Sequence, residues 1–188
     1  MTLSPGVRKL VLTAHVTSSL GWLGAVAVFL ALAIVALTSD NASTVRGAYL
    51  AMEPAARLTL VPLSLLALLT GVIQSLGTSW GLLRHYWVIF KLLINVIASI
   101  YLLLYLPSFE QFAATAADDS ADLDSVRNIS PALHAVLALL LLLVAAVLAV
   151  YKPRGVTPYG ERRRLERRQQ RTEPRARTAT TPSARRAE

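Results

Sequence analysis

The chain has 188 residues, of which 54% are hydrophobic and 16% are charged, and it contains no cysteine. This composition is too apolar for an ordinary soluble domain of this length, and the lack of cysteine excludes disulfides, thiolate nucleophiles and cysteine-bound metals. The formal net charge of +8 arises after residue 150, since residues 1–150 hold seven basic and seven acidic side chains whereas residues 151–188 hold twelve and four.

Four long apolar blocks account for the excess of hydrophobic residues, and Lys91 is the one charged residue within them. A helix needs about 20 apolar residues to cross a hydrocarbon core about 30 Å thick, and each block reaches that length. None has the alternation of a barrel strand, and the first is too long for the apolar region of a cleaved signal peptide. The sequence therefore predicts an all-α, four-helix transmembrane bundle in residues 1–152, with spans at residues 10–37, 58–83, 86–107 and 131–151.

The segment between the first two predicted spans has the pattern of a short surface helix. Asp40 or Asn41 is placed to cap its start, and Pro54 is expected to bend the chain into the second span. Three apolar residues of this segment share one helical face: Val45, Tyr49 and Met52.

The linker at residues 108–130 is acidic, with five carboxylates and one arginine. Carboxylate oxygens attract hard cations, but the linker has no Gly-bearing calcium-loop pattern. A solvated linker is therefore the favoured interpretation.

The tail at residues 153–188 is basic. Residues 160–171 have the composition of a juxtamembrane helix, and the remainder, rich in Thr, Pro, Arg and Ala, is predicted to be disordered. Binding to anionic lipid headgroups is the favoured role, since each basic residue near a membrane surface contributes about 1 kcal/mol. Nucleic-acid binding is disfavoured, because no aromatic residue follows Tyr159 to stack on bases.

Positive charge marks the cytoplasmic side of a membrane protein. Arg8, Lys9 and Arg84 flank predicted span ends on the side of the basic tail, whereas the acidic linker lies on the other side. We therefore predict that both termini are cytoplasmic. A homo-oligomer stays open, but transport has little support, because the spans contain no Asp or Glu to exchange protons and no internal repeat is evident.

Polar residues on three predicted spans fall at one depth. His15 and Lys91 each lie five residues inside a span from the cytoplasmic side, about 7–8 Å deep at a rise of about 1.5 Å per residue, and Gln74 falls at a similar level. Asn95 continues the face of Lys91 one turn later. Lys91 either snorkels to the headgroups or faces the interior near His15 or Gln74, and the stripe through Asn95 favours an internal site.

His134 lies near the opposite membrane face, about 15 Å or more from His15 in depth. Two nitrogen ligands on opposite sides of one metal are only about 4 Å apart. These histidines are therefore not expected to share a metal, and an interfacial or loop contact is the favoured interpretation of His134.

Two fragments resemble a known superfamily. In "HVTSSLGWLGA", His15 precedes a Trp-x-Gly motif at Trp22, and in "HYWVIFKLLINVI" an aromatic entry precedes Lys91. This pattern resembles the copper-resistance protein D and HemJ-type membrane proteins, of which the HemJ-type members are four-helix, b-haem-binding protoporphyrinogen oxidases. The resemblance implies a haem ligand at His15 and a functional lysine at Lys91. The segment after the first motif departs from that family, and no second axial ligand is evident at the level of His15.

Most of residues 8–160 also looks like a group of uncharacterised four-helix bacterial membrane proteins, on the segments "LGTSWGLLRHYWVIFKL" and "YKPRGVTPYG". This likeness implies the fold and a location in the bacterial cytoplasmic membrane, but it brings no known activity.

Two functions remain open. In the first, haem b or copper binds His15 through the imidazole. Lys91, Gln74 and Asn95 would then support the cofactor, and Trp22 would form a wall of its pocket; an enzyme of this kind would be a haem-dependent membrane oxidoreductase. In the second, the protein is a non-catalytic interaction or assembly protein, in which the polar layer joins helices at about 0.6 kcal/mol per hydrogen bond and the basic tail binds anionic lipid or a partner.

Overall fold

The computed structural model describes residues 3–78, 81–166 and 169. Its named elements are all helical: α1 (Pro5–Thr38), α2 (Ala42–Ala55), the π-helical turn η1 (Ala56–Leu60), α3 (Val61–Leu76), α4 (Tyr86–Ala117), α5 (Leu123–Val126) and α6 (Ser130–Tyr151). Four stretches are long and apolar enough to cross a membrane: Pro5–Thr38, Ala42–Leu76, Tyr86–Ala117 and Leu123–Tyr151. The prediction of an all-α integral membrane protein with four spans is thus confirmed, and these spans imply contact with a lipid bilayer.

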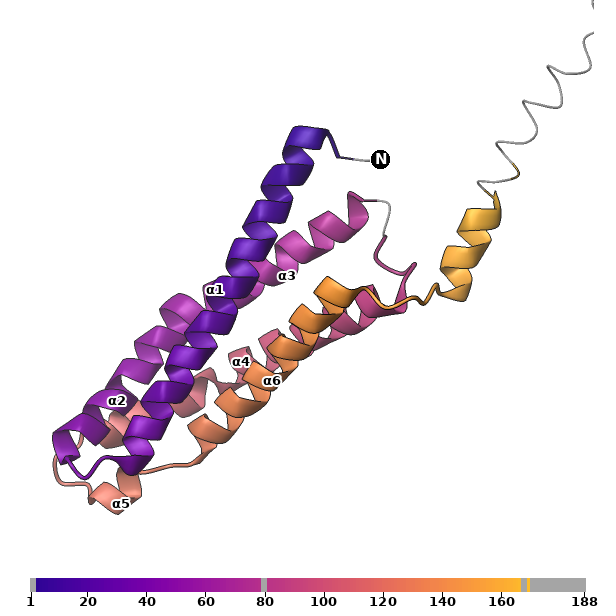
Figure 1. Cartoon of the computed structure of the whole chain (residues 1–188). Coiled ribbons are helices and arrows are strands. Elements are labelled where there is room, and N and C mark those ends of the chain that lie inside the picture. The colour runs from indigo at the N-terminus through magenta and orange to yellow at the C-terminus, as the bar shows by residue number, and fades with distance from the viewer. Residues whose placement is uncertain (1–2, 79–80, 167–168, 170–188) are drawn as a thin grey trace, which may run out of the picture.

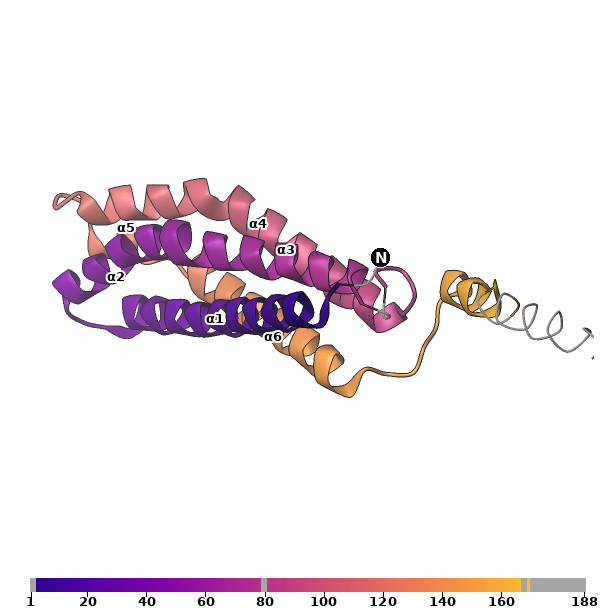
Figure 2. The same cartoon turned by 90° about the horizontal axis from the view of Figure 1, so that it is seen from above.

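The four long helical stretches form an elongated bundle (Figures 1 and 2). Helix α1 packs against α3 on one side and α6 on the other, and α4 packs against the same two helices. No close backbone approach joins α1 to α4 within the described residues, so these two helices lie diagonally across the bundle. Side chains, rather than backbone, must fill the space between them.

The second span differs from its prediction. We expected a separate surface helix followed by a span at residues 58–83, but α2, η1 and α3 form one continuous helical run that ends at Leu76. The π turn between Pro54 and Pro62 explains the continuity: the Val61 N–H reaches back five residues to the Ala56 carbonyl, so the run passes both prolines without a break.

The third span is also longer than predicted. Helix α4 continues through Pro107 to Ala117 instead of ending at residue 107, so much of the expected acidic linker is helical. The residues beyond the proline are held by packing, since Phe109 and Ala116 are buried and Phe112 contacts the Tyr49 ring. Helix α6 begins within one residue of its predicted start and ends at the predicted Tyr151.

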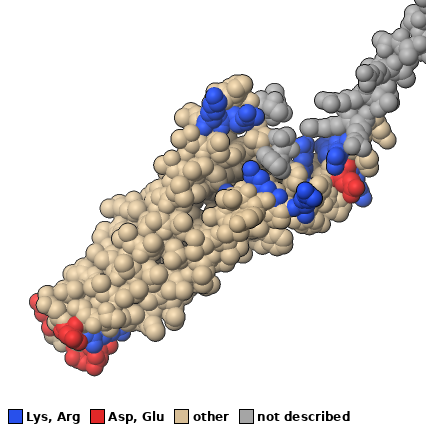
Figure 3. Space-filling view, in the orientation of Figure 1, with Lys and Arg blue, Asp and Glu red and all other residues tan. Residues whose placement is uncertain are grey.

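The two ends of the bundle carry opposite charges on the face seen in Figure 3. We call one the acidic end, comprising α2 and residues 109–129, and the other the basic end, comprising residues 3–9, 77–78, 81–85 and 152–166. The belt between them is almost uncharged on that face, as expected for a surface in contact with lipid.

The acidic end contains the best-buried side chains of the molecule. Val45, Tyr49 and Met52 are at most 1% exposed, which confirms that they share one buried face of α2. The Asn41 side chain accepts a hydrogen bond from the Thr44 N–H at 3.2 Å, so Asn41 rather than Asp40 caps the helix.

Long side chains at the acidic end bind the carbonyls left free where helices stop. Arg46 donates to the carbonyls of Ala116, Asp118 and Ala121 at 3.0, 2.7 and 2.6 Å, and so caps the end of α4. Arg127 donates to the Ser39 carbonyl at 2.7 Å, just after α1.

Tyr49 closes the acidic end from within. Its hydroxyl donates to the Asn128 carbonyl at 3.0 Å and accepts from the Asn128 N–H at 2.7 Å. This pair of hydrogen bonds ties the buried face of α2 to the residues that precede α6.

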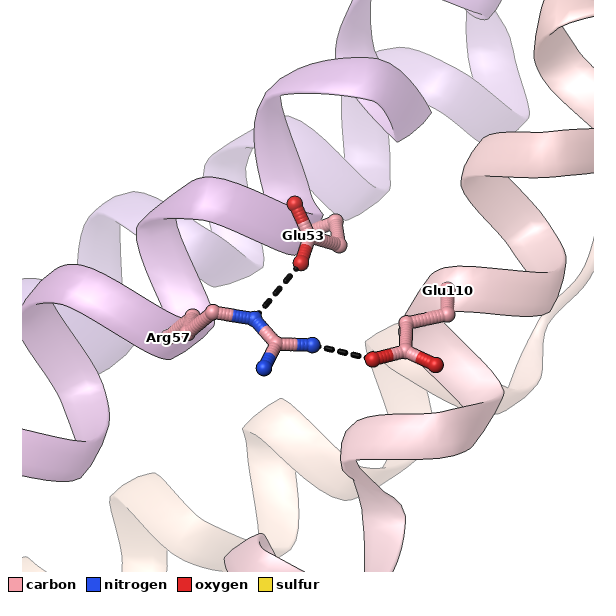
Figure 4. Close-up of polar contacts among 3 residues, drawn as sticks. All are labelled: Glu53, Arg57 and Glu110. Atoms are coloured by element: carbon pink, nitrogen blue, oxygen red, sulfur yellow. Dashed lines mark hydrogen bonds and ion pairs between the residues drawn. The ribbon is translucent and has the colours of Figure 1, made fainter.

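An ion-pair cluster joins η1 to α4 on the bundle surface (Figure 4). Arg57 binds Glu53 one turn earlier at 2.8 Å and also binds Glu110 of α4. The Arg57 and Glu110 side chains are about half exposed, so in water the cluster would contribute little to stability. Its main effect is to fix the π turn beside α4.

The chain after α6 folds back on the α3–α4 loop. Thr157 carries the contact: its N–H donates to the Arg84 carbonyl at 2.9 Å and its hydroxyl donates to the Leu83 carbonyl at 2.6 Å. The same hydroxyl accepts from the Gly160 N–H at 3.1 Å, which caps a helix that covers residues 158–166. The juxtamembrane helix thus begins two residues before its predicted start, and most of the tail predicted to be disordered lies outside the described residues.

Candidate functional site

A polar cavity of about 350 Å³ lies near the basic end of the bundle, between α1, α3, α4 and the last residues of α6. Four of the five residues that the sequence singled out for a cofactor site line it: His15, Gln74, Lys91 and Asn95. The bundle therefore brings side chains from three helices to one cavity; their common depth in a membrane stays a prediction.

His15 is held in one orientation by α3. Its Nδ1 lies 3.1 Å from the Ala67 carbonyl and 3.2 Å from the Thr70 hydroxyl. A carbonyl oxygen only accepts hydrogen bonds, so Nδ1 carries the proton, and the Thr70 hydroxyl is free to accept because it donates its own proton to Leu66. The lone pair of a neutral His15 is therefore on Nε2.

Lys91 donates a hydrogen bond to that lone pair. Its Nζ lies 3.0 Å from His15 Nε2, the distance of an N–H donor to a nitrogen acceptor. Lys91 thus points into the bundle rather than snorkelling to the surface, and it connects α4 to α1 across the diagonal where the two backbones do not meet.

Two amides complete the wall of the polar cavity. The Asn95 side chain donates to the Lys91 carbonyl at 2.8 Å and is 8% exposed, so it turns back on its own helix. The Gln74 Oε1 atom is buried and has no hydrogen-bond partner among the described residues. A buried acceptor without a partner costs free energy, which makes Gln74 the side chain with unused binding capacity.

Gly71 makes room for His15. A Cβ at this position would lie 3.0 Å from His15 Cε1 and 3.4 Å from Nδ1, closer than side chains pack without displacement. Ala67, Thr70 and Gly71 therefore form the seat of the imidazole on α3. The sequence analysis did not identify this seat, although the spacing of Ala67 and Gly71 by one helical turn was a signal that could have marked it.

Trp22 does not belong to the polar cavity, which corrects its predicted role as a wall beside His15. It lies seven residues after His15 on α1, about 10 Å further along the helix axis, and lines a second cavity with Tyr101 and His134. The two residues therefore line different cavities.

His134 forms its own cluster. Its Nδ1 lies 2.7 Å from the Ser130 carbonyl and its Nε2 lies 2.5 Å from the Tyr101 hydroxyl, while the Tyr105 hydroxyl lies 2.5 Å from Ser130 Oγ. His15 and His134 line different cavities. The sequence analysis missed Tyr101 and Tyr105, although the two tyrosines are four residues apart, on one helical face just before Pro107.

No group of three or more His, Asp or Glu side chains capable of holding a metal occurs in residues 3–78, 81–166 and 169. A metal at the polar cavity would therefore depend on His15 together with amine or amide ligands.

No family model matches the chain, and neither a curated protein nor a solved structure matches it. The resemblance on His15, Trp22 and Lys91 gains no support from these comparisons.

Proposed function

We propose that this integral membrane protein binds a metal-containing cofactor, copper or haem b, in the polar cavity, with His15 Nε2 as the metal ligand. The observation that carries the proposal is the fixed imidazole: Nδ1 donates to the Ala67 carbonyl while Nε2 faces Lys91 in the cavity. Histidines that bind metals commonly donate their second ring N–H to a carbonyl in this way, which fixes the tautomer and raises the basicity of the ligating nitrogen.

A copper ion fits the observed spacing of nitrogens better than an iron between two axial ligands. Two ligands with bonds of about 2 Å, set near a right angle, lie about 3 Å apart, and His15 Nε2 and Lys91 Nζ are separated by 3.0 Å. Lys91 would bind as the neutral amine after losing a proton. The unpartnered Gln74 Oε1 offers a third, weaker ligand from the same cavity, and nitrogen and oxygen donors suit copper.

Haem would use His15 alone. Lys91, whose Nζ lies 3.0 Å from His15 Nε2, would then pair with a carboxylate of the haem. Either metal would supply redox chemistry at the cavity when bound, and His15 and Lys91 would orient it.

Topology completes the proposal. The basic end, with Arg8, Lys9 and the helix at residues 158–166, would face the cytoplasm of a bacterial cell and contact anionic lipid headgroups, and both termini would lie inside. The separation of charge between the two ends in Figure 3 supports this orientation.

The test is metal analysis of detergent-purified protein with two matched histidine variants. After loading with copper and dialysis, we expect one equivalent of copper in the wild type and in His134→Gln, none in His15→Gln and a weaker complex in Lys91→Met. The visible spectrum after expression with excess haem covers the other cofactor: a Soret band that His15→Gln abolishes and His134→Gln retains would identify haem. A wild-type protein that retains neither copper nor haem would disprove the proposal, as would binding that is indifferent to His15.

A second candidate, an assembly protein without a cofactor, is favoured by one observation. All ring nitrogens of His15 already have partners on two other helices, so the polar layer serves as an interhelical contact without any ligand. The docked helix at residues 158–166 would then present its arginines to lipid or to another protein. Hydrogen exchange of residues 158–166 in nanodiscs with and without anionic lipid measures that contact: protection that rises with anionic lipid would support it, and unchanged exchange would contradict it.

A further inference from the structure

The second cavity, which we call the aromatic cavity, has a volume of about 240 Å³ and lies between α1, α4 and α6. It occupies the diagonal of the bundle where α1 and α4 do not approach each other. Ile97 of α4 and Leu137 of α6 line it and are 53% and 55% exposed. The aromatic cavity therefore opens toward lipid between these two helices, so that a molecule dissolved in the membrane can enter from the side.

Four of its sixteen lining residues carry a polar side-chain atom: Trp22, Tyr101, Tyr105 and His134. The remaining walls are aliphatic or phenyl groups. Such a lining, mostly apolar with a few polar groups, is typical of small-molecule sites.

The hydrogen bonds of His134 leave the Tyr101 oxygen with free lone pairs at the aromatic cavity. Nδ1 must carry the proton, because it lies 2.7 Å from the Ser130 carbonyl. Nε2 is then an acceptor, and the Tyr101 hydroxyl donates a hydrogen bond to it at 2.5 Å. The Tyr101 hydroxyl uses its one hydrogen in this bond, but its oxygen retains lone pairs that can accept a hydrogen bond from a ligand.

Trp22 supplies the complementary donor. Its side chain is 3% exposed and lines the aromatic cavity, and no hydrogen bond of its indole N–H occurs within the part of the chain that the structure describes. Among the described residues, the buried side-chain atoms that lack a partner belong to Gln74, Ser99 and Arg127 rather than to Trp22. The indole N–H therefore stays accessible, and because indole N–H groups usually find a partner, a ligand in the aromatic cavity can supply it.

We propose that the aromatic cavity binds a small lipophilic ring compound that bears one hydroxyl group. A hydroxyl both accepts and donates, so it satisfies the Trp22 N–H and the Tyr101 oxygen together, which neither a hydrocarbon nor a lipid acyl chain does. Rings of Phe29, Tyr105 and Phe109 pack edge to face at 5.0 and 4.9 Å along one wall, an arrangement that favours an aromatic guest. The volume exceeds the roughly 150 Å³ that holds benzene in an apolar protein cavity. The proposal is independent of the metal site, since the two cavities share no lining residue.

The probe pair is 4-bromophenol and 4-bromotoluene, which have nearly the same shape and differ by a hydroxyl in place of a methyl group. Bromine quenches tryptophan fluorescence on contact, and Trp22 lines the cavity. In nanodiscs at pH 7 we expect quenching by 4-bromophenol to saturate, and 4-bromotoluene to bind roughly tenfold more weakly for want of two hydrogen bonds.

Three variants assign the site. Trp22→Phe removes the donor and the tryptophan that lines the cavity, so the saturable part of the quenching is lost and only the quenching of Trp80 and Trp87 remains. Tyr101→Phe keeps the ring of an exposed residue but loses the acceptor. It should therefore weaken the binding of 4-bromophenol about fivefold without changing the binding of 4-bromotoluene. Ala138→Phe fills the cavity and abolishes binding of both probes.

Quenching that rises linearly for both probes, as partition into lipid produces, would overturn the proposal. Saturable binding with equal affinity for the two probes, or unchanged in Tyr101→Phe, would equally overturn it, because the site would then be an apolar gap filled by acyl chains. Tyr101→Phe also guards against loss of binding through unfolding. Its side chain lies at the cavity mouth and is 46% exposed, so removing the hydroxyl is not expected to unfold the protein.

Discussion

The acidic and basic ends of the bundle differ in how completely their polar groups are paired by hydrogen bonds. At the acidic end, Arg46 and Tyr49 fill the hydrogen-bonding capacity of helix ends and sit over fully buried apolar residues. Near the basic end, the polar residues lie between the spans rather than at helix ends, and Gln74 Oε1 keeps no partner. Since buried polar groups in proteins are nearly always paired, the acidic end is organised for stability and the polar cavity retains capacity for something else.

The contrast is not absolute. Arg127 Nε at the acidic end is also buried without a partner, but the same guanidinium is anchored through its other nitrogen to the Ser39 carbonyl. The Gln74 Oε1 atom, by contrast, has no hydrogen-bond partner among the described residues. The comparison therefore predicts that substitutions at the acidic end cost stability, whereas substitutions at the polar cavity cost little stability and change binding.

The largest effect is expected for Tyr49→Ala. Tyr49 is 1% exposed and makes two hydrogen bonds with Asn128, so its loss creates a cavity and leaves polar groups unpaired, at about 3–5 kcal/mol. Unfolding in mixed micelles by SDS titration measures it. Tyr151→Ala is the matched control, because that tyrosine is 78% exposed and should change stability by less than about 0.5 kcal/mol. Equal effects of the two variants would contradict the contrast between a buried core and a lipid-facing surface.

Arg46→Met is expected to destabilise by about 2 kcal/mol. Methionine preserves much of the aliphatic stem but removes the charged donors to the three carbonyls at the end of α4, and hydrogen bonds to charged groups contribute about 1.5–3 kcal/mol. Hydrogen exchange of the last turn of α4 would report the loss locally, and an unchanged exchange rate there would count against the capping role.

Gly71→Ala tests the seat of His15. The added Cβ would lie 3.0 Å from His15 Cε1, and overpacking of this kind costs about 1 kcal/mol or more. In a His15→Ala background the clash disappears, so the same substitution should be at least about 1 kcal/mol more favourable there. A double-mutant cycle on unfolding free energies gives the coupling, and a coupling of zero would mean that His15 does not rest on Gly71.

Lys91→Met is the counterpart of Arg46→Met and should change stability by less than about 0.6 kcal/mol in either direction. The variant loses one interhelical hydrogen bond to His15, typically about 0.6 kcal/mol within a membrane, but it also relieves the desolvation of a cation. SDS titration beside Arg46→Met makes the comparison direct. A loss as large as that of Arg46→Met would show that the polar cavity is a structural device, and would favour the assembly function over a binding site.

The smallest effect concerns Asp118, at the exposed tip of the acidic end. Hydrogen bonds from the Ser120 hydroxyl and N–H hold the pKa of this carboxyl below its usual value. A lowered folded-state pKa contributes stability above the unfolded-state value of about 4, and this contribution is lost as the pH falls through the folded-state pKa. In Ser120→Ala the Asp118 pKa should rise toward its usual value, measured by NMR titration. Any stability difference from the wild type should vanish at low pH, and a difference that persists there has another cause.

The sequence alone determined the class of the protein and which polar residues of three helices line one cavity. Apolar runs longer than a bilayer core leave little alternative to membrane helices, and a fixed rise per residue is enough to place His15, Gln74 and Lys91 at one level. Helix ends were harder, because Pro54 and Pro107 are breakers by local propensity, and packing of Tyr49, Met52, Phe109 and Ala116 overrides that propensity.

Only the tertiary structure decided which polar atoms meet. Periodicity gives a face and a depth but no partner, so it assigned Trp22 to the cavity of His15, which the intervening distance along α1 excludes. The tautomers of His15 and His134 depend on carbonyls of Ala67 and Ser130, and backbone carbonyls leave no trace in the sequence. The open diagonal between α1 and α4, from which both cavities arise, depends on how four helices pack, and that is set by many side chains at once rather than by any one motif.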